Sequence, residues 1–314
     1  MNIKDSKSHQ DNFLNNSIDL IKLVNLFWRK KIQIISITSL FAVFSVFYAL
    51  SLPDYYKSES ILVNAENTNQ LSGLQGLSGL ASIAGINIQN SRQDKSIVIF
   101  ETLKSRAFVR HLIKFDNILP SLVAAKEYDS SSQKIIFDSE VYDASNKVWL
   151  AKKSNNNKKD SKPSFIEAHA AYLEHVTINQ DKFTNLITIS VEHISPLFAK
   201  EFLDLIIREL NELLRFKDLQ DSTNAIDFLT SEIPKSSLVT MKDAINQLVH
   251  SRLEMQMMAR ISSDYALKII DPAYIPEEKS RPNRASICIM ITLAGGLFSV
   301  LFVLLRYFIS SKRM

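Results

Sequence analysis

The sequence predicts an α+β protein held in a membrane at both ends, and two observations carry this prediction. Each end of the chain holds one long apolar run, residues 32–52 and residues 285–309. Between these runs, residues 53–284 combine short strand patterns with long helical patterns. Because an α-helix rises about 1.5 Å per residue, roughly 20 apolar residues cross the hydrocarbon core of a bilayer. We therefore expect two transmembrane helices with one large domain between them.

The distribution of charge gives the expected orientation of the two spans. Residues 1–31 carry three more basic than acidic side chains, and the residues from Arg306 onward carry three basic and no acidic ones. Positive charge beside a span stays in the cytoplasm, so both tails, 1–31 and 310–314, are expected there. Residues 53–284 are then expected in the periplasm. Their net charge is −2, from 28 basic and 30 acidic side chains, so the basic excess of the chain indicates topology and predicts no nucleic-acid partner.

A cleaved signal peptide is the alternative for the first apolar run, because Ala49 and Ser51 imitate a cleavage site. The run is longer than the roughly 7–15 residues of a signal-peptide core, and a long polar tail precedes it. We therefore expect a retained anchor. The one cysteine, Cys288, lies in the second run, so no disulfide can form within the chain and the central domain is held by its core.

The first part of the central domain predicts one strand, one helix and one polar segment. Residues 55–63 alternate polar and apolar side chains, which is typical of a strand. Residues 94–115 place apolar side chains at helical spacing and predict one helix. Residues 126–163 are polar and rich in lysine, and the run at 152–163 is expected to be an exposed loop, with a binding patch as the alternative.

Four of the six glycines of the protein lie in residues 71–86, LSGLQGLSGLASIAGI, beside leucines spaced by three. A phosphate-binding loop would end in Gly-Lys-Ser or Gly-Lys-Thr, and the sequence has neither, so we expect no nucleotide and no other cofactor. An apolar mobile loop or a contact between subunits fits this composition better. The residues expected in such a contact are Gly73, Leu74, Gly76, Leu77, Gly79 and Leu80.

The next part of the domain predicts a helix followed by a β-hairpin. Ser164 and Glu167 have the spacing of a capping box, which would open a helix that runs to Leu173. Residues 175–178 and 186–191 have the composition of strands, and the sequence NQDKFTN between them predicts the turn that joins them.

Two long helices are expected next. Ser195 is a good N-cap, and Pro196 suits the first helical position, where its missing N–H costs nothing. No helix breaker follows before Pro234, which predicts about 37 residues, or roughly 55 Å, of helix. A second helix should run from Ser237 to about Ile261. Helices this long do not fit inside so small a domain, so we expect a projecting hairpin whose apolar face contacts other copies of the chain as well as itself.

The chain is expected to return through a strand at residues 265–270 and a proline-rich segment, DPAYIPEEKSRPNR. Proline fixes its own φ angle and pushes the preceding residue toward extended backbone. The prolines therefore predict a stiff strut before the second span, with a simple helix stop as the alternative. These residues are Pro272, Pro276 and Pro282.

These elements together predict the organisation of the chain. An α/β base would consist of residues 53–194 and 265–284 and would lie near the membrane. The helices of residues 196–262 would project from this base as a hairpin. The transmembrane helices of residues 32–52 and 285–309 would anchor it.

Both predicted spans contain small residues spaced four apart. Such residues let membrane helices approach closely, and would bind the two spans together, bind neighbouring subunits or bind a membrane partner. Chance spacing is the alternative. The residues concerned are Thr38, Ala42, Ser45, Ala49, Thr292, Gly295, Gly296 and Ser299.

The sequence contains no pattern of catalytic or metal-binding residues, so we expect no enzyme and no metal site. None of the six histidines has a His-Glu-x-x-His spacing, and there is no Gly-x-Ser-x-Gly elbow or kinase signature. His175 and His193 would be neighbours on the predicted hairpin, where a solvated or hydrogen-bonded pair is expected rather than a metal site. Acidic residues lie mostly on helix faces, in expected surface pairs such as Arg208 with Glu212.

Four segments of the sequence carry a family resemblance. They are IDLIKLVNLFWRKK before the first span, LPDYYKSESIL after it, the GLSGLASIAGI loop and, most specifically, DPAYIPEEKSRPNRA before the second span. In this order they resemble the bacterial O-antigen chain-length regulators, the Wzz-type polysaccharide co-polymerases, over nearly the whole chain. Some members have a fuller series of prolines. Larger relatives add a cytoplasmic tyrosine kinase with a phosphate loop, and this chain looks like the kinase-free class.

The resemblance implies a ring-like homo-oligomer in the bacterial inner membrane, with both termini in the cytoplasm. It also implies a non-enzymatic regulator, which sets the modal length of the O-antigen of lipopolysaccharide together with the membrane polymerase. The expected partners are therefore further copies of the chain, the O-antigen polymerase, the lipid-linked polysaccharide and membrane lipids.

Two alternatives stay open. The same architecture serves capsule, exopolysaccharide or enterobacterial common antigen, and the glycan phenotype or the neighbouring genes would decide between these polysaccharides. The second alternative is a membrane-tethered periplasmic sensor or transporter adaptor. A sensor needs an output domain, however, and the expected cytoplasmic tails are short.

Overall fold

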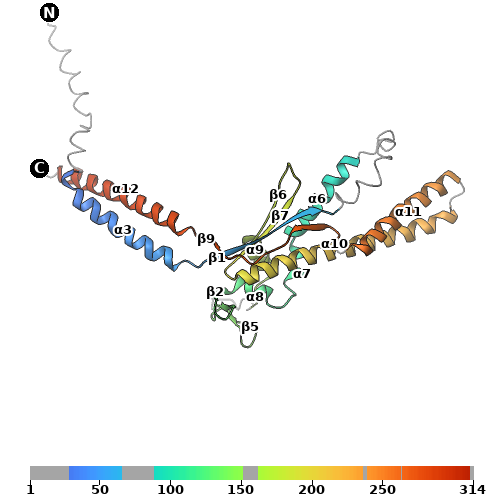
Figure 1. Cartoon of the computed structure of the whole chain (residues 1–314), viewed down its shortest axis with the longest axis horizontal. Coiled ribbons are helices and arrows are strands. Elements are labelled where there is room, and N and C mark those ends of the chain that lie inside the picture. Colours follow the sequence, from blue (N-terminus) through green and yellow to red (C-terminus); the bar gives the residue numbers. More distant parts are fainter. Residues whose placement is uncertain (1–27, 66–87, 151–161, 236–238, 263, 312–314) are drawn as a thin grey trace, which may run out of the picture. The chain divides into compact units, whose positions relative to one another are not determined.

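The computed structural model describes residues 28–65, 88–150, 162–235, 239–262 and 264–311 (Figure 1). The chain divides into two compact units. The first contains the two ends of the chain, residues 1–53 and 282–314, and the second contains residues 54–281. The proposed subunit-contact residues Gly73 to Leu80 and the lysine-rich run up to residue 161 lie outside the described residues.

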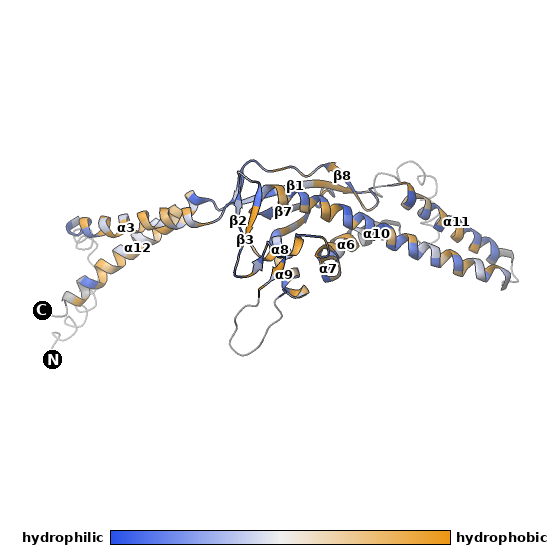
Figure 2. Ribbon diagram, turned by 90° about the horizontal axis from the view of Figure 1, so that it is seen from below, coloured by the Kyte–Doolittle hydropathy of each residue, from blue (hydrophilic) through white to orange (hydrophobic). Residues whose placement is uncertain are grey.

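The first unit is a pair of antiparallel helices, α3 (Lys31–Ser51) and α12 (Arg284–Ser311). Among the described residues, these are the two helices that are long and apolar enough to cross a membrane. Large apolar side chains are exposed along both helices, and Figure 2 shows α12 mainly in orange. A helix that is apolar on its exposed sides is suited to a lipid environment.

The second unit is built on a five-stranded antiparallel sheet with β1 (Tyr55–Asn64) in its middle. On one side β1 pairs with β7 (Ile187–His193), which pairs with β6 (Val176–Gln180). On the other side β1 pairs with β9 (Lys279–Arg281) near its start and with β8 (Leu267–Asp271) near its end. Alternate residues of β1 are buried, as expected for a strand with one covered face. They are Ser58, Ser60, Leu62 and Asn64.

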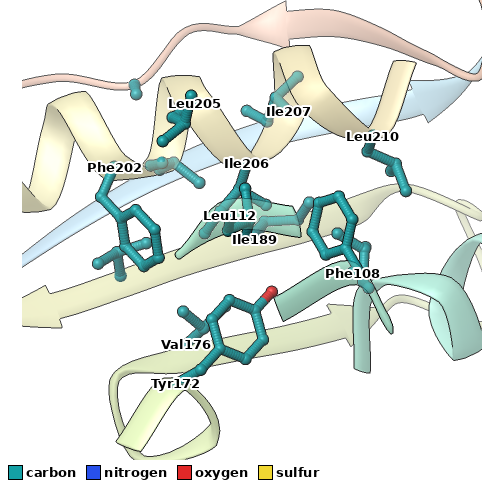
Figure 3. Packing of buried hydrophobic residues seen from close by; sticks show 14 of the residues in the cluster. Phe108, Leu112, Tyr172, Val176, Ile189, Phe202, Leu205, Ile206, Ile207 and Leu210 are labelled. Carbon is teal, nitrogen blue, oxygen red and sulfur yellow. The ribbon is translucent and has the colours of Figure 1, made fainter. Parts of the chain in front are cut away.

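Helices supply the core on one face of this sheet. The first half of α10 (Pro196–Glu232) packs against β1 and β7. Next to it, α9 (Phe165–His175) packs against α7 (Arg106–Leu112) and α8 (Ile118–Val123), and α6 (Ile88–Lys104) contacts α7 and α10. Figure 3 shows the resulting core, in which side chains of these helices meet those of β6 and β7.

The second half of α10 extends past the sheet and pairs with α11 (Val239–Ile261) as a helical hairpin (Figure 1). After Leu214, Ser222 is the one buried residue of α10. The amide of Gln256 donates a hydrogen bond to the hydroxyl of Thr223 at 2.9 Å and joins the two helices. Several large apolar side chains on this hairpin are exposed. They are Phe216, Phe228, Leu248, Leu253, Met257, Met258 and Ile261.

The predicted fold class is confirmed: helices and strands form one mixed domain, with a long helical hairpin and an apolar helix at each end. The strand at residues 55–63 is present as β1. Ser164 and Glu167 form the predicted capping box at the start of α9. Ser195 caps α10, which is 37 residues long, by accepting a hydrogen bond from the N–H of Phe198.

Two local predictions are wrong. Residues 94–115 do not form one helix, because Ser105 separates α6 from α7. The extended backbone of Ser105 lets its hydroxyl accept a hydrogen bond from the N–H of Phe108 and cap α7. Arg208 and Glu212 do not pair with each other. Each instead has a nearer partner on the same helix: Arg208 pairs with Glu209, and Glu212 pairs with Arg215.

Two small hairpins lie where the sequence predicted only a polar segment. One joins β2 (Ala125–Asp129) to β3 (Lys134–Phe137), and the other joins β4 (Tyr142–Asp143) to β5 (Val148–Trp149). An aspartate begins each turn, and its carboxylate accepts hydrogen bonds from backbone N–H groups two or three residues later. This side-chain turn is the sequence signal that could have revealed them.

Candidate functional site

The two apolar helices pack along a line of small residues. Four of the predicted small residues are buried: Ser45 and Ala49 on α3, and Gly295 and Ser299 on α12. The other four, Thr38, Ala42, Thr292 and Gly296, are half-buried. None of the eight is therefore fully exposed. Small side chains on both helices allow the backbones to approach each other closely.

The closest approach of the two helices is at Gly295. A Cβ atom on this glycine would lie 2.5 Å from both Cβ and Cγ of Phe41. The adjacent Gly296 differs, because its Cβ would meet Cγ2 of Thr38 at 3.9 Å, which is an ordinary contact. The ring of Phe41 also lies 6.0 Å from the ring of Phe298, measured between centroids. The sequence pattern located the two glycines, but it did not reveal that Phe41 faces Gly295.

Polar groups inside the pair add two contacts between the helices. The hydroxyl oxygens of Thr38 and Ser299 are 3.4 Å apart, and Thr38 also donates to the carbonyl of Ile34 at 2.9 Å. Further along, Sγ of Cys288 is 3.8 Å from the carbonyl oxygen of Ser45. Hydroxyl groups in an apolar helix can therefore bond both their own backbone and the neighbouring helix.

Arg284 joins the beginning of α12 to the end of α3. Its Nε donates to the carbonyl of Ala49 at 3.1 Å, and its Nη2 lies 3.4 Å from the carbonyl oxygen of Leu52. The last carbonyl groups of a helix have no partner within the helix and carry partial negative charge, so a guanidinium is favourable there. The sequence shows the charge of Arg284 beside the second apolar run but not its hydrogen bonds to the end of the first. The available signal was a basic side chain directly before the second apolar run.

In the second unit, residues 272–281 form a strap along β1. Where β1 passes from its pairing with β8 to its pairing with β9, buried hydroxyl groups of β1 bind the neighbouring chain. Ser60 donates to the carbonyl of Asp271, the last residue of β8, at 2.7 Å, and Ser58 donates to the carbonyl of Tyr274 in the strap at 2.7 Å. These two side-chain hydrogen bonds keep the chain attached to β1 where the backbone pairing of β8 with β1 ends.

The three prolines lie where backbone pairing is interrupted, with Pro272 and Pro276 in the strap and Pro282 directly after it. Pro272 follows β8, Pro276 lies in the irregular part, and Pro282 follows β9. Pro276 is buried, Pro282 is half-buried and Pro272 is exposed. Because proline has no N–H, it fits positions where the chain donates no ladder hydrogen bond.

The strap ends in a group of charged and aromatic side chains. Arg281 of β9 lies opposite Tyr55 of β1, and its guanidinium is 5.7 Å from the centroid of the Tyr55 ring. Arg281 also forms an ion pair with Glu192 of β7. Nearby, Nζ of Lys279 is 3.5 Å from Oδ1 of Asp54. Strand pairing, ion pairs and a cation–π contact therefore fix the end of the strap to the start of β1.

His175 and His193 are neighbours, as predicted, with ring centroids 5.4 Å apart. The buried His193 donates from Nε2 to the carbonyl of Ser121 at 2.9 Å and accepts at Nδ1 from the N–H of Ser195 at 3.1 Å. Burial lowers the pKa of His193 to about 4. His175 is hydrogen-bonded through Nδ1 to the carbonyl of Glu192. Among the described residues, no group of three or more His, Cys, Asp or Glu side chains could hold a metal ion.

Comparison with known proteins gave matches to two family models and to solved structures. Residues 16–114 match the model described as "Wzz: Chain length determinant protein". Residues 240–308 match the model described as "GNVR: G-rich domain on putative tyrosine kinase". No curated protein matches the sequence. Among solved structures, one described as "full-length bacterial polysaccharide co-polymerase" is similar with a TM-score of 0.43 and 14% identity, over 93% of this chain and 99% of that chain.

Proposed function

We propose that this protein sets the modal length of lipopolysaccharide O-antigen, because residues 16–114 match the chain length determinant model and Wzz-family co-polymerases are regulatory proteins that catalyse no reaction. The family match over residues 16–114 is the observation that carries this proposal. Regulation of polysaccharide length follows from the family itself. The choice of O-antigen is the finer claim, and it rests on the resemblance of the segments that flank the two spans.

The proposal includes a topology, with both termini in the cytoplasm and residues 54–281 in the periplasm. The basic excess of residues 1–31 supports it, since positive charge beside a span stays in the cytoplasm. The antiparallel pairing of α3 with α12 is compatible with it, because such a pair returns the chain to the side on which it began. The two apolar helices and the family match support an inner-membrane protein.

The hypothesised mechanism is a scaffold made of several copies of the chain. A ring of copies would organise the membrane polymerase, or hold the growing glycan, so that extension ends within a size window. The exposed apolar side chains of the α10–α11 hairpin support self-association, because contact with the hairpin of another copy would remove them from water. Cross-linking of the full-length protein in native membranes, followed by sizing, tests this part of the proposal. A protein that remains monomeric in lipid would contradict it.

Deletion of the gene tests the function directly. Lipopolysaccharide from the deletion strain, separated on a gel, should lose its modal band and show a broader ladder of O-antigen lengths. The intact gene supplied on a plasmid should restore the band. An unchanged ladder in the deletion strain would overturn the assignment to O-antigen.

Regulation of capsule or exopolysaccharide length is a second candidate. The match of residues 240–308 to a domain described on tyrosine kinases favours it, because larger relatives of this family carry such a kinase. Size-exclusion chromatography of capsule and exopolysaccharide from the same deletion strain distinguishes the two candidates. A change in these polymers with an unchanged lipopolysaccharide ladder would support the second candidate.

A further inference from the structure

A cavity of about 240 Å³ lies in the second unit, where α6, α10, the end of β1 and the residues before β8 meet. It is separate from the strap at the start of β1, and neither the hairpin contacts nor the histidine pair uses it. Its walls combine apolar side chains with charged ones. Such a combination is typical of a pocket for a ligand that has both an apolar and a polar surface.

One wall of the cavity is a single face of α10. Leu214, Lys217, Asp218 and Asp221 all line it, at spacings of three and four that place them on one side of the helix. Leu214 is buried, whereas Lys217 and Asp221 are exposed. The cavity therefore has an apolar floor and a charged rim that is open to solvent.

The opposite wall is apolar and comes from α6. Val98 and Ile99 contribute to it, and Ile99 is buried in the core. Val98 is exposed. An exposed valine beside a buried isoleucine and Leu214 gives an apolar surface that solvent can reach. A flat ligand face could therefore contact it without any rearrangement of the core.

The polar groups of the cavity are partly fixed in position. The hydroxyl of Tyr265 donates to Oδ2 of Asp218 at 2.7 Å, which orients both side chains before a ligand enters. In the described part of the chain, the side chains of Lys217 and Asp221 have no hydrogen-bond or ion-pair partner. One ammonium group and one carboxylate at the rim are therefore left to bind a ligand.

We propose that this cavity binds one neutral sugar unit of the polysaccharide, an inference that rests on the proposed function and names a binding site for its glycan. A pyranose ring has an apolar face of C–H groups and a rim of hydroxyls. Val98 and Leu214 would contact the C–H face. Asp218 and Asp221 would accept hydrogen bonds from hydroxyls, and Lys217 would donate to a ring or hydroxyl oxygen.

The charge and size of the cavity restrict the ligand. Two aspartates and one lysine give the lining a net charge of −1, which disfavours an anionic sugar. The volume is below the roughly 300–1,000 Å³ of typical ligand pockets, so it fits one sugar unit rather than a long segment. The open rim would let the polymer continue on both sides of the bound unit.

Saturation-transfer NMR on the full-length protein in detergent tests the proposal. The neutral probes are the methyl glycosides of glucose, galactose, mannose, rhamnose and N-acetylglucosamine, and sodium glucuronate is the anionic comparison. At least one neutral glycoside should receive saturation, and glucuronate should not. Asp221→Asn should weaken binding of that glycoside about tenfold, because it removes a charged acceptor. Val98→Trp should abolish binding by filling the cavity.

Asp227→Asn is the matched control, since Asp227 is exposed on the same helix and does not line the cavity. It should leave binding unchanged. The proposal is overturned if none of the neutral glycosides binds, if glucuronate binds as well as they do, or if the two aspartate variants behave alike. Failure of binding in a protein whose deletion does change polysaccharide length would remove this inference and leave the proposed function standing. If a glycoside binds the cavity but deletion of the gene changes no polysaccharide length, the proposed function is removed and the sugar-binding site stands.

Discussion

Gly295 of α12 lies so close to Phe41 of α3 that a Cβ atom on the glycine would be 2.5 Å from two side-chain carbons of the phenylalanine. The substitution Gly295→Ala should therefore push the helices apart and destabilise their pairing by about 1–3 kcal/mol. Gly296→Ala is the matched control, because its nearest contact would be an ordinary 3.9 Å. Thermal unfolding in detergent measures the difference. Equal melting temperatures for the two variants would contradict the packing described here.

Asn211 of α10 binds the start of β8 through three hydrogen bonds. Its Oδ1 accepts from the N–H groups of Ala266 and Leu267, each at 2.8 Å, and its Nδ2 donates to the carbonyl of Leu267 at 3.0 Å. Asn211→Leu should destabilise the protein by about 3 kcal/mol, because buried backbone groups lose their partners. Asn224→Leu, at an exposed position of the same helix, should change stability by less than about 0.5 kcal/mol. Denaturant unfolding compares the two variants, and similar losses would refute the role of Asn211.

Tyr172 has a buried hydroxyl group with no hydrogen-bond partner among the described residues. Figure 3 shows its ring in the core, and burial raises the pKa of this phenol above its ordinary range. Tyr172→Phe removes an unsatisfied polar atom, so it should leave stability unchanged or raise it by about 1 kcal/mol. Tyr265→Phe should have the opposite effect, because the hydroxyl of Tyr265 is bonded to Asp218. A clear loss of stability in Tyr172→Phe would show that its hydroxyl is satisfied after all.

His193 should make stability fall as the pH is lowered from 6.5 toward 4. Burial lowers its pKa in the folded protein from the ordinary 6.5 to about 4, so the unfolded chain binds more protons between these values. Protonation of Nδ1 also removes the acceptor for the N–H of Ser195. The loss from this residue is about 3 kcal/mol across the window, and nothing is lost above it.

Melting temperatures of the full-length protein between pH 7.5 and pH 4 measure this dependence. His193→Gln should be less stable at neutral pH but should show a smaller pH slope. His250→Gln, at an exposed position of α11, should keep the slope of the original protein. An unchanged slope in His193→Gln would assign the pH dependence to other groups.

The parts of the fold that follow from local sequence could be predicted, and the parts that depend on distant pairing could not. Ser195, Pro196 and Pro234 define the limits of α10 through backbone effects that act within a few residues. The interruption between α6 and α7 at Ser105 is different. A serine is tolerated inside a helix, so this residue ends α6 only because packing in the core gives α7 a new direction. Likewise β9 is too short to show a strand pattern, and it exists because β1 lies beside it.

The helix interface shows the same limit. A spacing of four identified Gly295 and Gly296 as candidates, because small residues on one face are visible in the sequence. The spacing could not show which of the two glycines is the closer contact, since the clash of an added Cβ atom depends on which α3 side chain lies opposite. Phe41 acquires its role only when the two helices are paired, and no local pattern marks it. The charge of Arg284 is visible in the sequence, but its hydrogen bonds to the end of α3 depend on the pairing.

The pairing of Tyr55 with Arg281 means that residues 54–281 begin and end on neighbouring strands. Neighbouring strands are about 4.8 Å apart, so a fragment cut at these two positions has its new ends side by side. Such a fragment should fold in water without any lipid, and circular dichroism of the purified piece would report it. A short peptide loop between the two ends could then replace the membrane helices as a tether, and new termini could be opened elsewhere in the sheet without loss of its strand order.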